Sequence, residues 1–315
     1  MAALSDNLLI VTVLAYLGAM LLYAAQYAFG ERSVLAKAAT RELVGAGGPP
    51  VAEVVTSEST RIAKDRQLGR YALLTTVVAG AAHAATVFTR SMAAGRLPWG
   101  NMYEFVLTVT LLGCAVWLAV AVLRPELRHL GLFLAFTELL LVGVAGMVLH
   151  VPIGPLVPAL DSYWFVIHVG AATTASGLFL VGFASSVMYL LRSGYDAGKR
   201  GFLYPYGRLF PEAAKVERLS FRLHAFAFPI WTFAVAAGAI WAEAAWGRYW
   251  GWDPKETWAF ISWIVYAGYL HARATPSVKR QTAAIIAIVG WLTMMMNLFG
   301  VNIFLSGLHS YGGLN

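Results

Sequence analysis

The chain has 315 residues, of which 59% are hydrophobic and only 12% are charged, and its mean hydropathy is +0.66. About a quarter of the residues in an ordinary soluble domain are charged, so this composition excludes that class and predicts a membrane protein. The formal net charge is +7, but the basic residues form no aromatic-interleaved patch, which argues against nucleic acid as a partner.

Eight apolar blocks follow one another along the chain, each close to the roughly 20 residues that a helix needs to cross a bilayer. They predict an all-α polytopic membrane protein with about eight transmembrane helices. The blocks lie at 8–29, 71–89, 104–123, 129–150, 165–191, 223–243, 257–272 and 282–305.

The basic residues predict the orientation. Nineteen of the 23 Lys and Arg residues lie in alternate loops, and only Arg90, Arg96, Arg248 and Lys255 lie on the other face. The positive-inside rule makes the richer loops cytoplasmic, so both termini and the segment between the sixth and seventh blocks are expected on the external face.

Two parts are expected. Residues 1–70 hold the first helix and a cytoplasmic linker, because 45–50 read GAGGPP, with a short helix before Arg41. Residues 71–315 form the membrane core, in which 193–222 either lies along the inner membrane surface or forms a helical hairpin. The absence of an internal repeat counts against a typical secondary transporter.

Residues 241–258 read WAEAAWGRYWGWDPKETW, with five tryptophans in eighteen residues. An aromatic belt at the membrane interface explains some of them. A planar ligand explains the order better, because indoles offer broad faces for stacking and glycines allow a close approach of the backbone. We therefore favour a platform for a planar ligand and keep the belt as the alternative.

Histidines strengthen that interpretation. His168 and His309 fall on the same predicted face as the tryptophans, and two neutral imidazoles can fill both axial positions of a haem iron. His271, near the inner end of the seventh block, is equally a functional and an interfacial candidate. Structural or interfacial roles are expected for the other four histidines, which are His83, His129, His150 and His224.

The single cysteine, Cys114, lies in an apolar block and is expected to be a small buried residue. The chain therefore has no disulfide of its own, no CxxC pair for thiol exchange and no CxxCH segment that would make it a c-type cytochrome.

WGRYWGWDPKETW, followed by YLHAR, resembles the "WWD" signature of haem-handling proteins, and within them the CcsA/ResC family, called CcsB in some bacteria. RSMAAGRLPWGNMYEF at 90–105 and SYWFVIHV at 162–169 resemble further elements of that family. The resemblance covers about 80–305.

The resemblance implies roles for particular residues. His168 and His309 would be the external axial ligands of haem iron, and His271 a ligand lower in the membrane. The second inner ligand would come from a Ccs1/ResB-type partner, with His83 as the candidate within this chain. The platform that presents haem would include Trp246, Gly247, Trp250, Gly251, Trp252, Asp253, Pro254 and Trp258.

Four charged side chains of this segment have expected roles. Arg248 and Lys255 are expected to pair either with haem propionates or with lipid headgroups. Asp253 and Glu256 are expected to cap the N-terminus of the seventh helix.

The implied function is that of one component of a system II cytochrome c synthase in the bacterial cytoplasmic membrane, rather than the thylakoid. It would carry reduced haem b outward and present it for thioether attachment to the CxxCH segment of apocytochrome c, with a thiol-reducing protein acting indirectly. The alternatives are a CcmC-like protein that delivers haem to a chaperone, and a non-haem transporter whose tryptophans form only a belt.

Overall fold

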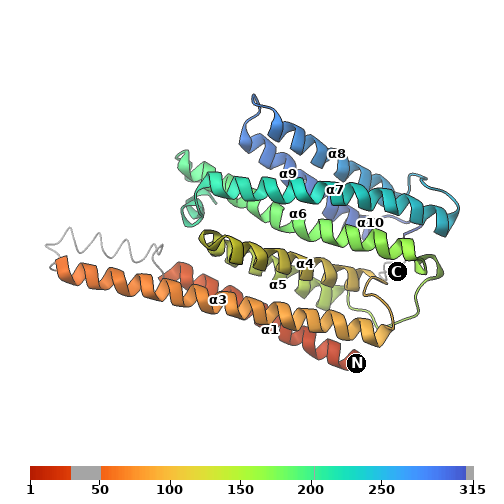
Figure 1. Ribbon diagram of the computed structural model, residues 1–315, viewed down its shortest axis with the longest axis horizontal. Coiled ribbons are helices and arrows are strands. Elements are labelled where there is room, and N and C mark those ends of the chain that lie inside the picture. The colour runs from red at the N-terminus through yellow and green to blue at the C-terminus, as the bar shows by residue number, and fades with distance from the viewer. Residues whose placement is uncertain (30–50, 202, 310–315) are drawn as a thin grey trace.

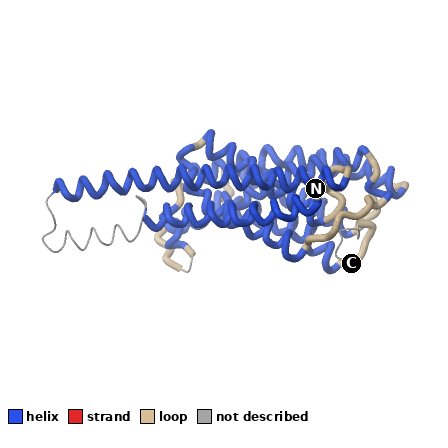
Figure 2. Tube along the Cα trace, turned by 90° about the horizontal axis from the view of Figure 1, so that it is seen from below, coloured by secondary structure: helices blue, strands red, loops and turns tan. Residues whose placement is uncertain are grey.

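The computed structural model describes residues 1–29, 51–201 and 203–309, and that part of the chain is helical without a strand. Figure 1 shows the helices side by side in one elongated bundle. Figure 2 shows the same elongated bundle from below. The long helices are α1 (Ala2–Phe29), α3 (Val51–Ala94), α4 (Met102–Leu123), α5 (Gly131–Val148), α6 (Tyr163–Asp196), α7 (Ala213–Trp246), α8 (Pro254–Ala274) and α9 (Arg280–Met295). Each predicted block corresponds to one of them, so the all-α prediction is confirmed.

Short elements join or extend the long helices. They are the 3-10 turns η1 (Pro125–Leu130), η2 (Pro158–Leu160) and η3 (Tyr204–Leu209), the π-helical turn η4 (Met296–Gly300) and α10 (Val301–Phe304). Because η4 and α10 follow α9 directly, the last block is a helix whose path is shifted near its end.

Seven helices of the described chain are long and apolar enough to cross a membrane, and α8 is not among them. Charged residues near both ends of α8, including Lys255, Glu256 and Arg273, leave it a shorter apolar stretch than its neighbours have. The molecule is a polytopic membrane protein. A count of eight spans stays a prediction.

Helix α3 corrects the predicted linker. It begins at Val51, directly after Pro50, so residues 51–70 are helical. These twenty residues contain Ala, Glu, Lys, Arg and Gln and no proline, and such residues favour a helix. The rest of the predicted linker, with the short helix expected before Arg41, lies outside the described residues.

The described residues of 193–222 form the turn of a helical hairpin, which is one of the two expectations, and a position along the membrane surface stays a prediction. The segment consists of the end of α6, the turn η3 and the start of α7, so the two long helices simply extend past the apolar blocks. Arg192 stabilises this end, because its guanidinium donates to the Phe210 carbonyl oxygen over 2.6 Å and to Asp196 over 3.0 Å.

Helix α6 lies at the centre of the bundle and is the most buried of the seven candidate spans. Its contact with α4 depends on Gly177, since a Cβ there would lie 2.8 Å from Cβ of Leu112. Small residues at such crossings let membrane helices approach closely.

The N-terminus and several loops between helices lie at one end of the bundle. The Asp6 carboxylate lies 3.1 Å from His150 Nε2, and the guanidinium of Arg90 donates to the Val151 carbonyl over 2.7 Å. Trp241 donates to Ala159 over 2.9 Å. Figure 1 shows this end on the right, with the N-terminus near it. The loop charges predict that this end is external.

Candidate functional site

A cavity opens at this end between α6, α7, α8 and the η4 turn. Its volume is about 980 Å³, including the space at its mouth. Small-molecule sites are typically apolar clefts with a few placed polar groups. This cavity fits that description, because aromatic and aliphatic side chains surround the polar groups of His168, Lys255, Glu256, Asn297 and His309.

His168 reaches the cavity from the second turn of α6. Its Nδ1–H donates to the Ala234 carbonyl over 2.8 Å, and its ring stacks on Trp241 with centroids 5.8 Å apart and an interplanar angle of 11°. A Cβ on Gly238 would lie 2.7 Å from the imidazole, so only glycine leaves room for this ring position. The ring is therefore held from two sides, with its lone pair on Nε2.

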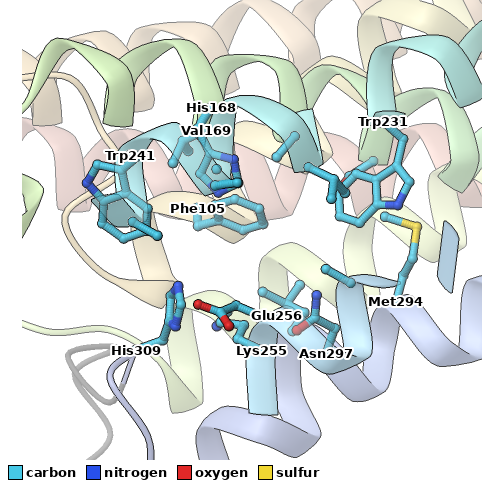
Figure 3. A pocket seen from close by; sticks show the side chains of 18 of the residues that line it. Phe105, His168, Val169, Trp231, Trp241, Lys255, Glu256, Met294, Asn297 and His309 are labelled. Atoms are coloured by element: carbon cyan, nitrogen blue, oxygen red, sulfur yellow. The ribbon is translucent and has the colours of Figure 1, made fainter. Parts of the chain in front are cut away.

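His309 reaches the same cavity from the chain that follows α10. Its Nδ1 lies 2.8 Å from Asp253 Oδ1, to which it donates. Its ring meets Trp246 edge-on at 4.9 Å and Trp241 at 5.6 Å. In Figure 3, His168 and His309 lie on opposite sides of the cavity with Trp241 at one flank. The structure thus brings the two predicted external histidines together, although they are 141 positions apart in the sequence.

Asp253 and Glu256 cap α8, as predicted, in a capping box. Asp253 Oδ1 accepts from the Lys255 amide over 3.0 Å, and Glu256 Oε2 accepts from the amides of Gly251 (2.8 Å) and Asp253 (3.1 Å). These bonds satisfy amides that a helix N-terminus leaves without intrahelical partners.

Burial acts on the pKa values of the His309–Asp253 pair. Burial by itself would raise the pKa of Asp253, but the hydrogen bonds from His309, Leu308 and Lys255 outweigh it and lower that pKa to about 2. Burial lowers the pKa of His309. At neutral pH the pair is therefore a carboxylate beside a neutral imidazole.

The predicted tryptophan platform is not one continuous surface. Trp246 contacts His309, and Trp250 lines the cavity. Trp252 is 66% exposed, with its backbone at φ 59, and neither it nor Trp258 lines the cavity. Pro254 is the first residue of α8, where its fixed φ suits a helix start.

The two glycines of the segment shape the backbone. Gly247 ends α7 at φ 71, a left-handed conformation that glycine adopts without strain. Gly251 packs against the Arg248 guanidinium, where a Cβ would overlap it. Direct contact of either glycine with a ligand stays a prediction.

The two basic residues of the tryptophan segment lie differently. Lys255 lines the cavity, whereas Arg248 lies outside the lining and approaches Glu256, with 3.5 Å between Nη1 and Oε1. The expected pairing with an anionic ligand group therefore fits the position of Lys255 better than that of Arg248.

His271 and His83 are not brought to this cavity. His271 lies in the last turn of α8 and is exposed, about 27 Å along the helix from Asp253 at 1.5 Å per residue. His83 lies buried in α3, with Nδ1 3.2 Å from Tyr16 Oη. An inner haem site with either residue stays a prediction.

The remaining histidines and Cys114 were expected to have structural or interfacial roles. His150 pairs with Asp6, and His224 and Cys114 are buried. The side chain of His129 lies outside the described residues.

The loop at 95–101 is fixed by one buried carboxylate. Glu104 lies 3.1 Å from Arg90 Nε and 2.6 Å from Arg96 Nη1, and it also accepts from the Gly100 amide over 2.9 Å. This network holds Trp99 where it lines a smaller pocket that adjoins the cavity and shares His168 and His309 with it. The NMYEF element is thus a structural support for the site.

Several lining residues were not predicted. On α7, Trp231, Val235, Gly238 and Ala242 recur at helical spacing and share one face, a periodicity that the sequence contains. Met294, Met295, Asn297 and Leu298 line the cavity from the end of α9 and from η4. π-Helical turns often occur at functional sites, but a sequence pattern does not reveal them.

The chain is similar to known proteins over most of its length. The family model described as "Cytochrome C assembly protein" matches residues 99–309. The chain is 34% identical to the "Cytochrome c biogenesis protein CcsA" of Guillardia theta over 245 residues, which cover 72% of this chain and 80% of that protein. It is 31% identical to the CcsA of Porphyra purpurea over 304 residues, which cover 85% of this chain and 95% of that one.

A solved structure, "Cytochrome c Heme Lyase CcmF", aligns with the whole chain and 52% of its own length, at 16% identity and a TM-score of 0.49. The family match at residues 99–309 includes the lining of the cavity and the two histidines. The chain belongs to the CcsA family of cytochrome c biogenesis proteins.

Proposed function

We propose that this protein is the component of a system II cytochrome c synthase that carries haem b to the external membrane face and presents it to apocytochrome c. The observation that carries the proposal is the pair His168 and His309, which face one apolar cavity from opposite sides. Neutral imidazoles on both sides of a planar ring are suited to the two axial positions of haem iron.

The surroundings support a large planar substrate. Trp241 and Trp250 offer indole faces at the outer part of the cavity, and Phe105 lines its wall. Aromatic faces and edges bind flat apolar rings with favourable geometry. Lys255, the cation in the lining, would pair with a propionate.

The reaction would be addition of each CxxCH thiol across one haem vinyl group. The sulfur forms a bond to one vinyl carbon and the proton goes to the other, so a reduced thiol needs no external oxidant. The intrinsic reactivity is that of the haem. The protein would contribute position, because it holds the ring while the vinyl edge faces the incoming segment.

A Ccs1/ResB-type membrane protein is the proposed partner, and it would supply the second ligand to an inner haem at His271. A thiol-reducing protein would act indirectly on the apocytochrome. The proposed location is a bacterial cytoplasmic membrane, with the cavity external because the loops at the opposite end hold most of the basic residues.

Haem content of the purified protein tests the site. Wild-type protein should co-purify haem with a low-spin spectrum typical of two histidine ligands. His168→Ala and His309→Ala should each change that spectrum or remove the haem. His150→Ala is the matched control, because His150 lies at the same end but pairs with Asp6 outside the cavity lining. A haem-free wild type, or unchanged spectra in both variants, would contradict the proposal and favour a transporter.

Attachment is tested separately in a bacterial host that lacks its own assembly genes. Co-expression with a Ccs1/ResB-type partner and a CxxCH reporter should give covalent haem on the reporter, detected by haem staining after denaturing electrophoresis. Haem bound to this protein without covalent product would indicate a CcmC-like delivery function instead.

A further inference from the structure

The segment 307–309, which leads to the cavity, is attached to the start of α8 by the Asp253 carboxylate. Asp253 Oδ1 accepts from His309 Nδ1 over 2.8 Å, and Oδ2 accepts from the Leu308 amide over 2.7 Å. The same Oδ1 also accepts from the Lys255 amide. Asp253 thus joins the cap of a helix to a histidine 56 residues later.

The attachment is close and buried. Asp253 is 6% exposed, and a Cβ on Gly307 would lie 2.5 Å from its Oδ2. The carboxylate fixes both the position of the 307–309 backbone and the orientation of the His309 ring. Because Oδ1 can only accept, the Nδ1–H tautomer is selected and the lone pair of the imidazole lies on Nε2.

The histidine on the opposite side of the cavity has a different partner. His168 Nδ1 donates to the neutral main-chain carbonyl of Ala234. A carboxylate partner makes an imidazole a stronger donor to a metal than a carbonyl partner does, and loss of such a partner typically costs about 10–100-fold in metal affinity. The two histidines therefore differ in the strength with which each would bind haem iron.

On the basis of the proposed haem function, we propose that Asp253 is a positioning residue that orients His309, strengthens its bond to haem iron and makes it the stronger of the two axial ligands. Asp253 acts through His309 and does not itself touch the iron. Its capping of α8 is a separate contribution to folding.

Asp253→Asn separates the two contributions. Asn caps helices about as well as Asp, so α8 keeps its cap, while the charge at His309 and the bond that Oδ2 accepts from the Leu308 amide are lost. Purified Asp253→Asn should retain haem with a reduction potential shifted to more positive values, because a weaker donor stabilises ferric iron less. Exogenous imidazole should replace His309 at concentrations about 10–100-fold lower than in the wild type.

Two further variants keep the experiment decisive. Glu243→Gln removes the same charge from the same end of the molecule, but Glu243 is exposed and outside the cavity lining. It should leave the potential and the imidazole titration as in the wild type. In a His309→Ala background, Asp253→Asn should produce no additional shift, because interacting residues are not additive.

The outcomes distinguish this inference from the proposed function. If wild-type protein binds no haem, or His309→Ala leaves the spectrum unchanged, the proposed function itself fails. If His309→Ala changes the spectrum but Asp253→Asn matches the wild type, only the inference is overturned. An equal shift from Asp253→Asn with and without His309 would also overturn it. A fall in the thermal unfolding midpoint of Asp253→Asn with unchanged haem properties would show a purely structural residue.

Discussion

The outer cavity and the centre of the bundle each hold a histidine with nearly the same local contacts. His168 donates from Nδ1 to the Ala234 carbonyl, and His224 donates from Nδ1 to the Ser220 carbonyl, both over 2.8 Å. Each ring also lies against a glycine of a neighbouring helix. A Cβ would come within 2.7 Å of His168 at Gly238, and a Cβ at Gly182 would come within 2.6 Å of His224.

The two histidines differ in what surrounds the other ring nitrogen, Nε2. His168 faces the cavity, whereas the ring of His224 is surrounded by Phe179, Tyr266 and Tyr269, and its Nε2 is buried without a hydrogen-bond partner among the described residues. Burial and a fixed tautomer are therefore not sufficient to make a ligand candidate. An adjoining space large enough for the ligand is also needed.

The largest difference in haem binding is expected between substitutions of the two glycines that contact these histidines. Gly238→Val should displace His168 and reduce haem per protein about 10-fold or more, as expected when the support of a metal ligand is lost. Gly182→Val should overpack the core around His224, at a cost of about 1–3 kcal/mol, yet keep the haem spectrum. Pyridine haemochrome assays and thermal unfolding in detergent measure the two effects. Equal haem loss in both variants would remove the distinction.

A middle-sized effect is expected at the cavity mouth. Lys255→Gln should weaken haem binding about 10-fold, because a hydrogen bond to a charged group contributes about 1.5–3 kcal/mol. Arg248→Gln should change binding much less, because Arg248 lies outside the cavity lining. Haem titration followed by absorbance compares the two. Comparable losses would mean that both cations hold propionates.

The smallest effect is expected from His224→Leu. Leucine has a similar volume and removes a buried nitrogen that lacks a partner, so the free energy of unfolding should change by less than about 1.5 kcal/mol. The haem content should equal that of the wild type. A loss of haem at normal stability would indicate that His224 serves a second haem position and would break the comparison.

Much of the fold could be predicted from the sequence, since each apolar block became one long helix. The boundaries were less predictable: α3 begins at Val51 because helix-forming residues continue beyond the apolar block. Hydropathy reports where a helix can be buried in lipid, and it does not report where the helix ends in water.

The candidate site was predictable in part. His168, His309, Trp250 and Lys255 line the cavity as expected, and Trp246 lies against His309. Trp252, within the same motif, points away and is largely exposed. A run of tryptophans does not state which indoles face inward, because the turn between Gly247 and Pro254 rotates successive side chains in different directions.

By itself, the sequence determined the membrane character, the helical blocks and the family, and it marked His168 and His309 as candidates, because composition, period and motif are local properties of the chain. Only the tertiary structure decided that Trp231, Gly238 and Asn297 share one cavity and that His271 lies far from it. It also decided that Asp253 accepts from His309, 56 residues away. Such contacts depend on how helices cross, and a crossing is set by the packing of small and large side chains that no single segment specifies.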